Sequence, residues 1–279
     1  MIALLEILER TDAFLKKKGV ASPRLDAELL LGHVLGMTRL EVYMNFERPM
    51  MDSELDALRP YVKRRGEREP MAYILEKREF WSLDFRCGPG VLIPRPDTET
   101  LVEAALEFCE GETFVADVGA GTGCVGLSIA KEKDDVKLFA TDVSPEALAL
   151  VKHNAEALAL KERVAVLRGN LLDPIPENRA VDVVVSNPPY IPSADIAGLE
   201  PEVASFEPQL ALDGGTDGLD CYRELIPAAF SRARRALLVE VGAGQASDVA
   251  ALFEAAGFTD VQQHNDLAGI ARVVSGRRP

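Results

Sequence analysis

The sequence predicts an α/β protein in which a mostly parallel, Rossmann-like sheet follows a small helical bundle. From residue 113 onward, short β-branched runs alternate with helical stretches, which is typical of a parallel sheet covered on both faces. Residues 1–73 are instead rich in leucine at helical spacing. We therefore expect a helical domain at 1–73, a β-hairpin linker at 74–95 and the α/β domain at 96–279.

Three helices are expected in the first domain. Leucines at i, i+3/i+4 and i+7 spacings predict a helix near 4–15. Ser22-Pro23 predicts the start of a second helix, because serine can cap free amides and proline suits the first helical position. Gly36 is a suitable end for it. A third helix is predicted from Asp52 to the basic run at 63–65.

The linker has the composition of two short strands. Residues 80–85 and 91–93 are rich in apolar and aromatic side chains, and the glycines and proline of 88–90 predict a turn between them. Asp97 or Thr98 can then cap a helix.

The second domain should contain seven strands. The last two candidates have no helix between them, so we expect them to pair as an antiparallel hairpin. Strand candidates are 113–118, 136–141, 163–168, 181–186, 236–241, 258–264 and 270–275, and helix candidates are 123–132, 145–159, 219–234 and 244–256.

Composition excludes several classes of protein. The four cysteines stand alone and the three histidines are far apart, which predicts no metal site and a reducing, cytoplasmic location. No apolar run approaches the length of roughly 18 residues that a membrane span needs. Residues 1–75 are balanced in charge, so the net charge of −14 lies in the remainder. An acidic catalytic domain disfavours direct nucleic-acid binding.

A glycine-rich turn follows the first strand of the sheet. Glycines allow the backbone to approach a ligand closely, and the start of the next helix offers free amides. An acidic residue about 20 positions on can accept both hydroxyls of a ribose, so the pattern fits either NAD or S-adenosylmethionine (SAM). The candidate cofactor-binding residues here are Gly119, Ala120, Gly121, Thr122, Gly123 and Asp142.

Two further positions complete the predicted cofactor site. Asn170 and Leu171 follow the third strand, where they could meet an adenine ring. Asp117 lies within the first strand, and its carboxylate could support the loop or reach an ammonium group of the cofactor.

The Asn187-Pro188-Pro189-Tyr190 motif decides between the two cofactors. It follows the fourth strand and forms a stiff loop that is poor in amide donors. The Asn187 side-chain oxygen and the Pro188 carbonyl can accept both protons of a planar NH2 group, while Tyr190 stacks on its plane. Such a loop suits a SAM-dependent N-methyltransferase of the Rossmann-like class I type, whereas a dehydrogenase has no use for it. Asn187, Pro188 and Tyr190 are the catalytic candidates, and Pro189 joins them in binding the substrate.

The chain resembles the release-factor glutamine methyltransferase family (PrmC/HemK). The resemblance spans nearly the whole sequence and rests on the segments 22–30, 69–74, 79–81, 92–99, 187–190 and 206–215. It implies SAM-dependent N5-methylation of the glutamine in the Gly-Gly-Gln motif of bacterial peptide-chain release factors, with S-adenosylhomocysteine as product. It also implies that residues 119–123, Asp142, Asn187 and the segment around Leu171 bind SAM, and that the helical domain docks on the release factor.

Two alternatives stay open at this point. DNA or RNA adenine and cytosine N-methyltransferases use a similar Asn/Asp-Pro-Pro-aromatic loop on a flipped base. A binding protein could also use the methyltransferase fold without catalysis. The apparently intact cofactor and acceptor motifs favour an enzyme.

Overall fold

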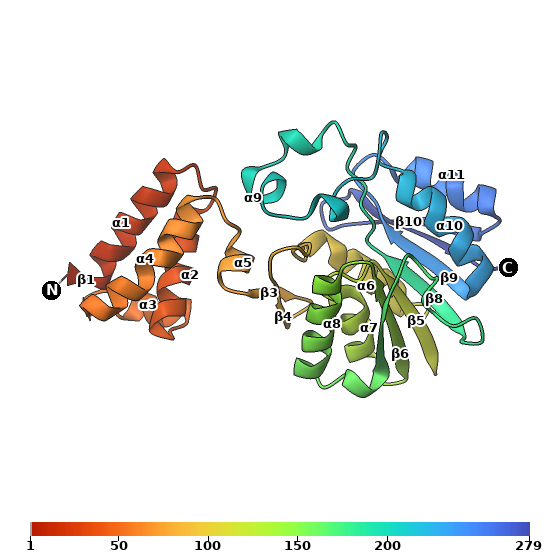
Figure 1. Ribbon diagram of the computed structural model, residues 1–279, viewed down its shortest axis with the longest axis horizontal. Coiled ribbons are helices and arrows are strands. Elements are labelled where there is room, and N and C mark those ends of the chain that lie inside the picture. Colours follow the sequence, from red (N-terminus) through yellow and green to blue (C-terminus); the bar gives the residue numbers. More distant parts are fainter. Residues whose placement is uncertain (1) are drawn as a thin grey trace. The chain divides into compact units, whose positions relative to one another are not determined.

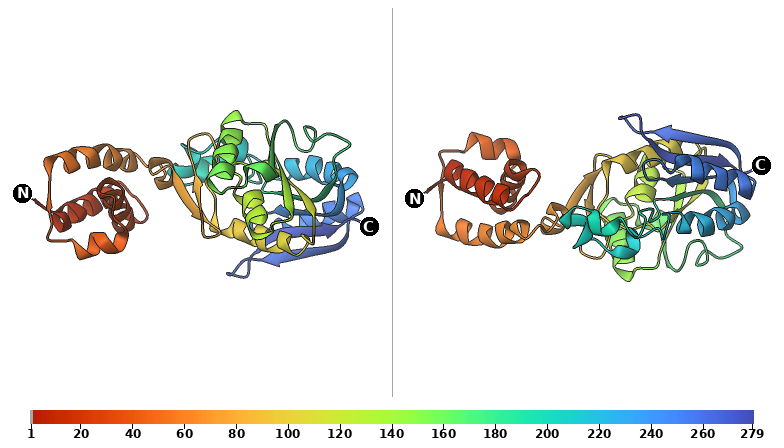
Figure 2. Two further views of the ribbon diagram at one scale, coloured as in Figure 1. Left: turned by 90° about the horizontal axis from the view of Figure 1, so that it is seen from below. Right: turned by 90° about the horizontal axis from the view of Figure 1, so that it is seen from above.

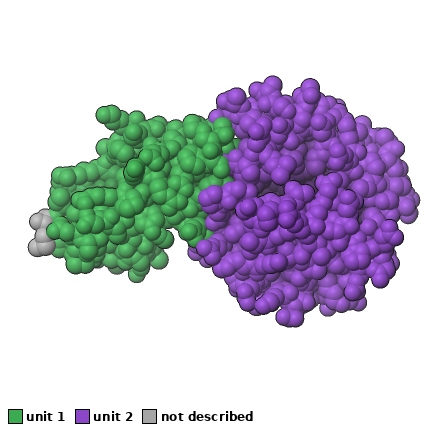
Figure 3. Space-filling model, viewed as in Figure 1, with its two compact units in different colours: residues 1–76, 200–206 green, residues 77–199, 207–279 purple. Residues whose placement is uncertain are grey.

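The computed structural model describes residues 2–279 and divides them into two compact units (Figure 3). Unit 1 contains the chain up to Glu76 together with Glu200–Phe206, and unit 2 contains Lys77–Leu199 and Glu207–Pro279. The short helix α9 (Pro201–Ala204) thus belongs to unit 1, although the sequence around it belongs to unit 2. Composition had given no indication of this excursion.

Unit 1 is a helical bundle around a leucine-rich core (Figure 2). The three predicted helices are present, and Gly36 ends the second in the left-handed conformation, as expected. A further helix was not predicted, although Thr38 and Glu41 form the capping box that begins it. The elements are β1 (Ile2–Ala3), α1 (Leu4–Lys17), α2 (Pro23–Leu35), α3 (Arg39–Met44), β2 (Pro49–Met50), α4 (Asp52–Gly66) and α5 (Met71–Ile74).

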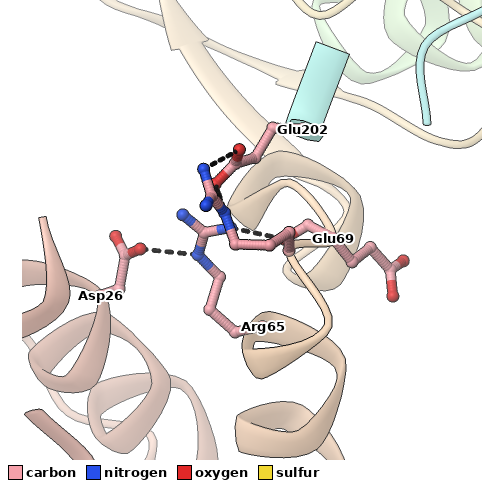
Figure 4. A network of polar contacts seen from close by, with 5 residues as sticks. Asp26, Arg65, Glu69 and Glu202 are labelled. Carbon is pink, nitrogen blue, oxygen red and sulfur yellow. Dashed lines mark hydrogen bonds and ion pairs between the residues drawn. The ribbon is translucent and has the colours of Figure 1, made fainter. Parts of the chain in front are cut away.

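An ion network centred on Arg65 holds α9 within unit 1 (Figure 4). The buried guanidinium donates from Nε to Asp26 at 2.7 Å and from Nη1 to Glu202 at 2.9 Å and to the Glu69 carbonyl at 3.0 Å. Arg68 donates from Nε to the same Glu202 carboxylate at 2.7 Å. The basic run at the end of α4 therefore has a partly structural role, because Arg65 within it pairs with two acidic side chains, Asp26 and Glu202.

Unit 2 contains a seven-stranded sheet in the order β10-β11-β9-β8-β5-β6-β7. Neighbours from β9 to β7 are parallel, and β11 is antiparallel to both β9 and β10. The predicted strand set and the C-terminal hairpin are confirmed. The strands are β5 (Thr113–Val118), β6 (Val136–Asp142), β7 (Val164–Arg168), β8 (Val181–Ser186), β9 (Ala233–Glu240), β10 (Thr259–Asn265) and β11 (Ala271–Arg277).

Helices cover both faces of the sheet, with α6, α7 and α8 on one side and α10 and α11 on the other (Figure 1). Alternate residues of the central strands enter two separate hydrophobic clusters, one on each face. Val115 and Val183 lie in the cluster under α6, α7 and α8, whereas Ala116 and Val184 lie in the cluster under α10 and α11. Burial on both faces explains why these strands are apolar throughout. The helices are α6 (Glu99–Leu106), α7 (Cys124–Glu132), α8 (Pro145–Ala157), α10 (Asp220–Arg232) and α11 (Ala246–Ala256).

A hairpin lies within the predicted linker, but both its strands and its turn differ from those expected at 80–85, 88–90 and 91–93. It consists of β3 (Lys77–Phe80) and β4 (Leu83–Arg86), joined at Trp81 and Ser82. Both turn residues have positive φ, at 52° and 55°, and the Trp81 amide donates to a Glu99 carboxylate oxygen at 2.8 Å. Tertiary contacts thus stabilise a turn of non-glycine residues. Residues 88–93 form an irregular segment with no strand.

Four single turns of 3-10 helix complete the described elements: η1 (Pro96–Thr98), η2 (Lys161–Arg163), η3 (Ile196–Gly198) and η4 (Gln209–Ala211). Within residues 2–279, no helix combines the length and the apolar character that crossing a membrane requires.

Candidate functional site

The carboxyl ends of β5, β6, β7 and β8 surround a cavity of about 270 Å³ in unit 2. Parallel strands bring their C-terminal loops to one edge of a sheet, so segments far apart in sequence meet there. The predicted cofactor residues that line the cavity are Gly119, Ala120, Gly121, Thr122, Asp142, Asn170, Leu171 and Asn187. Pro188 and Pro189 also line it, whereas Gly123 and Tyr190 are not among the lining residues.

Asp142 connects the glycine loop to the start of α8. Its Oδ2 accepts a hydrogen bond from the Gly121 amide at 2.9 Å, and its Oδ1 accepts one from the Ser144 amide at 2.9 Å. Gly121 has a φ of 57°, which favours glycine. Each carboxylate oxygen still has a lone pair, so Asp142 can hold the loop and also accept ribose hydroxyls.

Asp117 is buried at the end of β5 and lines the same cavity. Burial raises the pKa of its carboxyl to about 7, although the Gly126 amide, which donates to it at 2.9 Å, acts in the opposite direction. A side chain at position 126 would place Cβ 2.8 Å from Asp117 Oδ2 and 2.7 Å from Leu138 Cδ1. The lack of a side chain at Gly126 therefore makes room for the acid.

Leu171 lies in the loop after β7 and lines the same cavity as the glycine loop. It has a positive φ of 44°, and its carbonyl accepts a hydrogen bond from the Thr141 hydroxyl at 2.8 Å. This contact presents the half-buried Leu171 side chain and the neighbouring Asn170 at the cavity.

The acceptor corner, residues 187–190, follows β8, the parallel neighbour of β5. Asn187 Nδ2 donates to the Thr98 hydroxyl at 3.2 Å. Across residues 2–279, no donor occupies Asn187 Oδ1 or the Pro188 carbonyl. Asn187 Oδ1 and the Pro188 carbonyl are therefore free acceptors on residues that line the same cavity as the glycine loop.

Tyr190 has a different setting from the one expected. Its hydroxyl donates to Glu240 Oε1 at 3.3 Å, and its main-chain carbonyl accepts from Gln245 Nε2 at 2.9 Å. Burial, with a further contribution from the Glu240 charge, raises the pKa of the phenol. These contacts with Glu240 and Gln245 anchor the acceptor corner. Stacking of the Tyr190 ring on a substrate stays a prediction.

Two segments on which the family resemblance rests, 92–99 and 206–215, support the corner. The Ile191 amide donates to the Leu212 carbonyl at 2.9 Å, and the Gly214 amide donates back to the Ile191 carbonyl at 2.9 Å. The buried Glu207 accepts from the Ile93 amide at 3.3 Å and from Arg95 Nη2 at 2.5 Å. The segments 92–99 and 206–215 thus brace the acceptor loop.

Sequence reasoning missed the roles of Thr98 and Glu240. Thr98 had been considered only as a helix cap, and Glu240 had not been singled out. A signal for Glu240 was present, because it is the one acid within the otherwise apolar strand predicted at 236–241.

The cavity fits the chemistry of SAM. A glycine loop allows close approach, Asp142 offers acceptors for a ribose, and the buried Asp117 offers a negative charge for a cationic ligand. Among the described residues, no group of three His, Cys, Asp or Glu side chains is placed to hold a metal ion.

Comparison with known proteins agrees with this geometry. Residues 6–75 match the PrmC N-terminal domain, and residues 96–198 match the methyltransferase small domain. A methyltransferase from Pyrococcus furiosus superposes with a TM-score of 0.53 at 16% identity, over 70% of this chain and 89% of its own, which shows a class I methyltransferase fold.

Relatives along the whole chain are closer in sequence. A release factor glutamine methyltransferase from Geobacter sulfurreducens is 44% identical over 274 residues, which cover 98% of this chain and 95% of the relative. One of the same name from Rhodospirillum rubrum is 43% identical over 281 residues, which cover 99% and 86%. The chain therefore belongs to the release factor glutamine methyltransferase family.

Proposed function

We propose that this protein transfers a methyl group from SAM to N5 of the glutamine in the Gly-Gly-Gln motif of bacterial peptide-chain release factors. The observation that carries the proposal is that the glycine loop lines one cavity with Asn187 and Pro188, the residues that carry the two free acceptors. The name shared by the relatives from Geobacter sulfurreducens and Rhodospirillum rubrum supports the choice of substrate.

In this proposal the cavity holds the cofactor through its backbone and two acids. Residues 119–123 would approach its amino-acid part, with Asp117 near the ammonium group, and Asp142 would accept the ribose hydroxyls. Asn170 and Leu171 would hold the adenine. When bound, SAM supplies an electrophilic methyl group.

The acceptor corner would hold the glutamine amide. Asn187 Oδ1 and the Pro188 carbonyl accept its two N–H bonds, which favours build-up of positive charge on nitrogen as the new bond forms. An amide nitrogen is a weak nucleophile, so most of the remaining acceleration comes from alignment, worth up to about 7–11 kcal/mol. Tyr190 and Pro189 complete the wall around the side chain, and no nucleophilic residue of the enzyme is needed.

Unit 1 would dock on the release factor. Its helix α3 presents Leu40 and Met44 with 68% and 75% of their surfaces exposed, which is unusual for two neighbouring large apolar residues. The three cysteines at 87, 109 and 124 are free and buried, in keeping with the cytoplasmic location predicted for the reaction.

The test is incubation of the protein with purified release factor and SAM, followed by mass spectrometry of the Gly-Gly-Gln peptide. A gain of one methyl group on the glutamine is expected. Asn187→Ala should abolish this transfer and leave release-factor binding largely in place. Methyl transfer to DNA or RNA instead would favour a nucleic-acid methyltransferase, and binding without any transfer would favour a non-catalytic protein.

A further inference from the structure

Thr98 and Glu240 form a buried pair behind the acceptor corner. Thr98 is 1% exposed and Glu240 is 2% exposed. The Thr98 hydroxyl accepts from Asn187 Nδ2 at 3.2 Å, and Glu240 Oε1 accepts from the Tyr190 hydroxyl at 3.3 Å. Glu240 is the last residue of β9, which runs parallel to its neighbour β8. The carboxyl ends of the two strands therefore lie at the same edge of the sheet. The pair therefore touches both polar side chains of the corner.

One oxygen of the Glu240 carboxylate lacks a hydrogen-bond donor among the described residues. Oε2 is buried and has no hydrogen bond of ordinary geometry within the described part of the chain. The Thr98 hydroxyl acts to lower the pKa of the Glu240 carboxyl, which is the effect of a donor that faces the carboxylate. Because a buried, unpartnered oxygen is costly, we expect the single hydroxyl hydrogen of Thr98 to point toward Glu240.

This direction has a consequence for Asn187. A hydroxyl that donates to Glu240 can only accept from its other neighbour, so Asn187 must turn Nδ2 toward Thr98. Asn187 Oδ1 then faces away from Thr98 and remains available at the cavity that Asn187 lines. With the amide turned the other way, its NH2 group would meet the NH2 group of the substrate, and two donors would oppose each other.

We propose that Glu240 and Thr98 are positioning residues that fix the orientation of the Asn187 amide, so that its oxygen accepts from the methyl-acceptor nitrogen. Glu240 acts through Thr98 on Asn187 and directly on Tyr190. The inference rests on the proposed function for its kinetic readout. It does not depend on that function for the orientation of the amide, which can be measured without any substrate.

The charge state of Glu240 should control this arrangement. Burial raises the pKa of the Glu240 carboxyl to about 7, while Thr98, Tyr190 and the Arg272 charge act to lower the pKa and Asp97 acts to raise it. Arg272 is shared with Asp97 at 2.8 Å and with Asp266 at 3.0 Å. Once protonated, Glu240 can donate to Thr98, whose hydrogen is then free to turn toward Asn187 and favour the wrong orientation.

Three variants test this relay from Glu240 through Thr98 to Asn187, and a fourth variant is a control. Thr98→Val removes the hydroxyl at nearly constant shape, and Thr98→Ser restores it. Glu240→Gln keeps the volume and removes the charge. Tyr222→Phe is the control, because the Tyr222 hydroxyl donates to the main-chain oxygen of Glu240 at 2.7 Å and leaves the carboxylate alone.

The first measurement follows the Asn187 side-chain NH2 resonances by NMR in the ligand-free protein, assigned by their loss in Asn187→Ala. In the wild type and Tyr222→Phe they should shift with a midpoint near the pKa of about 7. In Glu240→Gln and Thr98→Val that titration should be absent, and Thr98→Ser should regain it. Resonances that titrate identically in all variants, or not at all in the wild type, would overturn the proposal.

The second measurement is kcat with release factor over pH 6–8, with the cofactor Kd measured in parallel. Thr98→Val and Glu240→Gln should lose roughly 10- to 100-fold in kcat, the expected size of one misdirected hydrogen bond, and keep the cofactor Kd within about twofold. Glu240→Gln should also lose the fall in kcat below pH 7. Wild-type kcat in both variants would contradict the relay. If the wild type itself does not methylate release factor, the proposed function fails and the NMR result alone decides this inference.

Discussion

Replacing Arg65 with methionine tests the ion network of unit 1. The substitution keeps much of the side-chain volume and removes the guanidinium. Arg65 and Asp26 have side chains only 7% and 9% exposed, and they are joined at 2.7 Å. Even with Arg65 present, burial raises the pKa of Asp26, because desolvation outweighs the hydrogen bond and charge of the arginine. The variant would leave this acid buried without a cation.

The magnitude follows from which charges lose their partners. Removing one member of a buried pair costs about 3–5 kcal/mol. Glu202 keeps Arg68 and is 15% exposed, so its loss is partly compensated. The cost of leaving Asp26 without its cation thus dominates. We expect the local free energy of unfolding of unit 1 to fall by about 3 kcal/mol, the lower end of that range.

Hydrogen exchange of the full chain is the appropriate assay, because two compact units need not unfold in one step. Amides of α2 and α4 should exchange roughly a hundredfold faster in Arg65→Met at pH 7, since 1.4 kcal/mol is a factor of ten. Arg59→Ala, on the same helix but 73% exposed, is the matched control and should change exchange less than about threefold. Equal protection in Arg65→Met and Arg59→Ala would refute the reasoning.

Three further predictions concern unit 2. Asp142→Ala should raise the Kd for S-adenosylhomocysteine by roughly 10- to 100-fold by calorimetry, because a charged acceptor is lost, whereas the exposed Asp195→Ala should leave the Kd unchanged. Gly126→Ala should lower the free energy of unfolding of unit 2 by about 1–3 kcal/mol in denaturant titrations, because its Cβ would overlap Asp117 and Leu138; Gly198→Ala, with nothing within 4 Å, should be near neutral. Asp117→Asn should weaken the pH dependence of stability. The Asp117 pKa of about 7 lies above its unfolded value, so this group's contribution is complete below about pH 4 and disappears as pH rises through 7. The variant should keep only the similar slope due to Glu240, and an unchanged slope between pH 5 and 8 would contradict this assignment.

Local patterns predicted most of the fold. The spacing of apolar residues identified every strand of the sheet and its covering helices. Strands that are buried on both faces are apolar along their whole length, which makes them easy to recognise. The glycine turn and the Asn187 motif also predicted a shared cavity, since both follow parallel strands. The hairpin turn was misplaced because Trp81 and Ser82 adopt positive φ with help from Glu99, a residue remote in sequence.

The sequence by itself thus determined the order of elements, the edge of the sheet where the cavity lies and most of the residues that line it. Only the tertiary structure decided which polar side chains lie behind those residues: Thr98 behind Asn187, Glu240 behind Tyr190, and Glu202 beside Arg65. The physical reason is that periodicity records whether a residue is buried and on which face. It does not record which partner a buried polar group finds, because such partners come from segments 50 to 137 residues away.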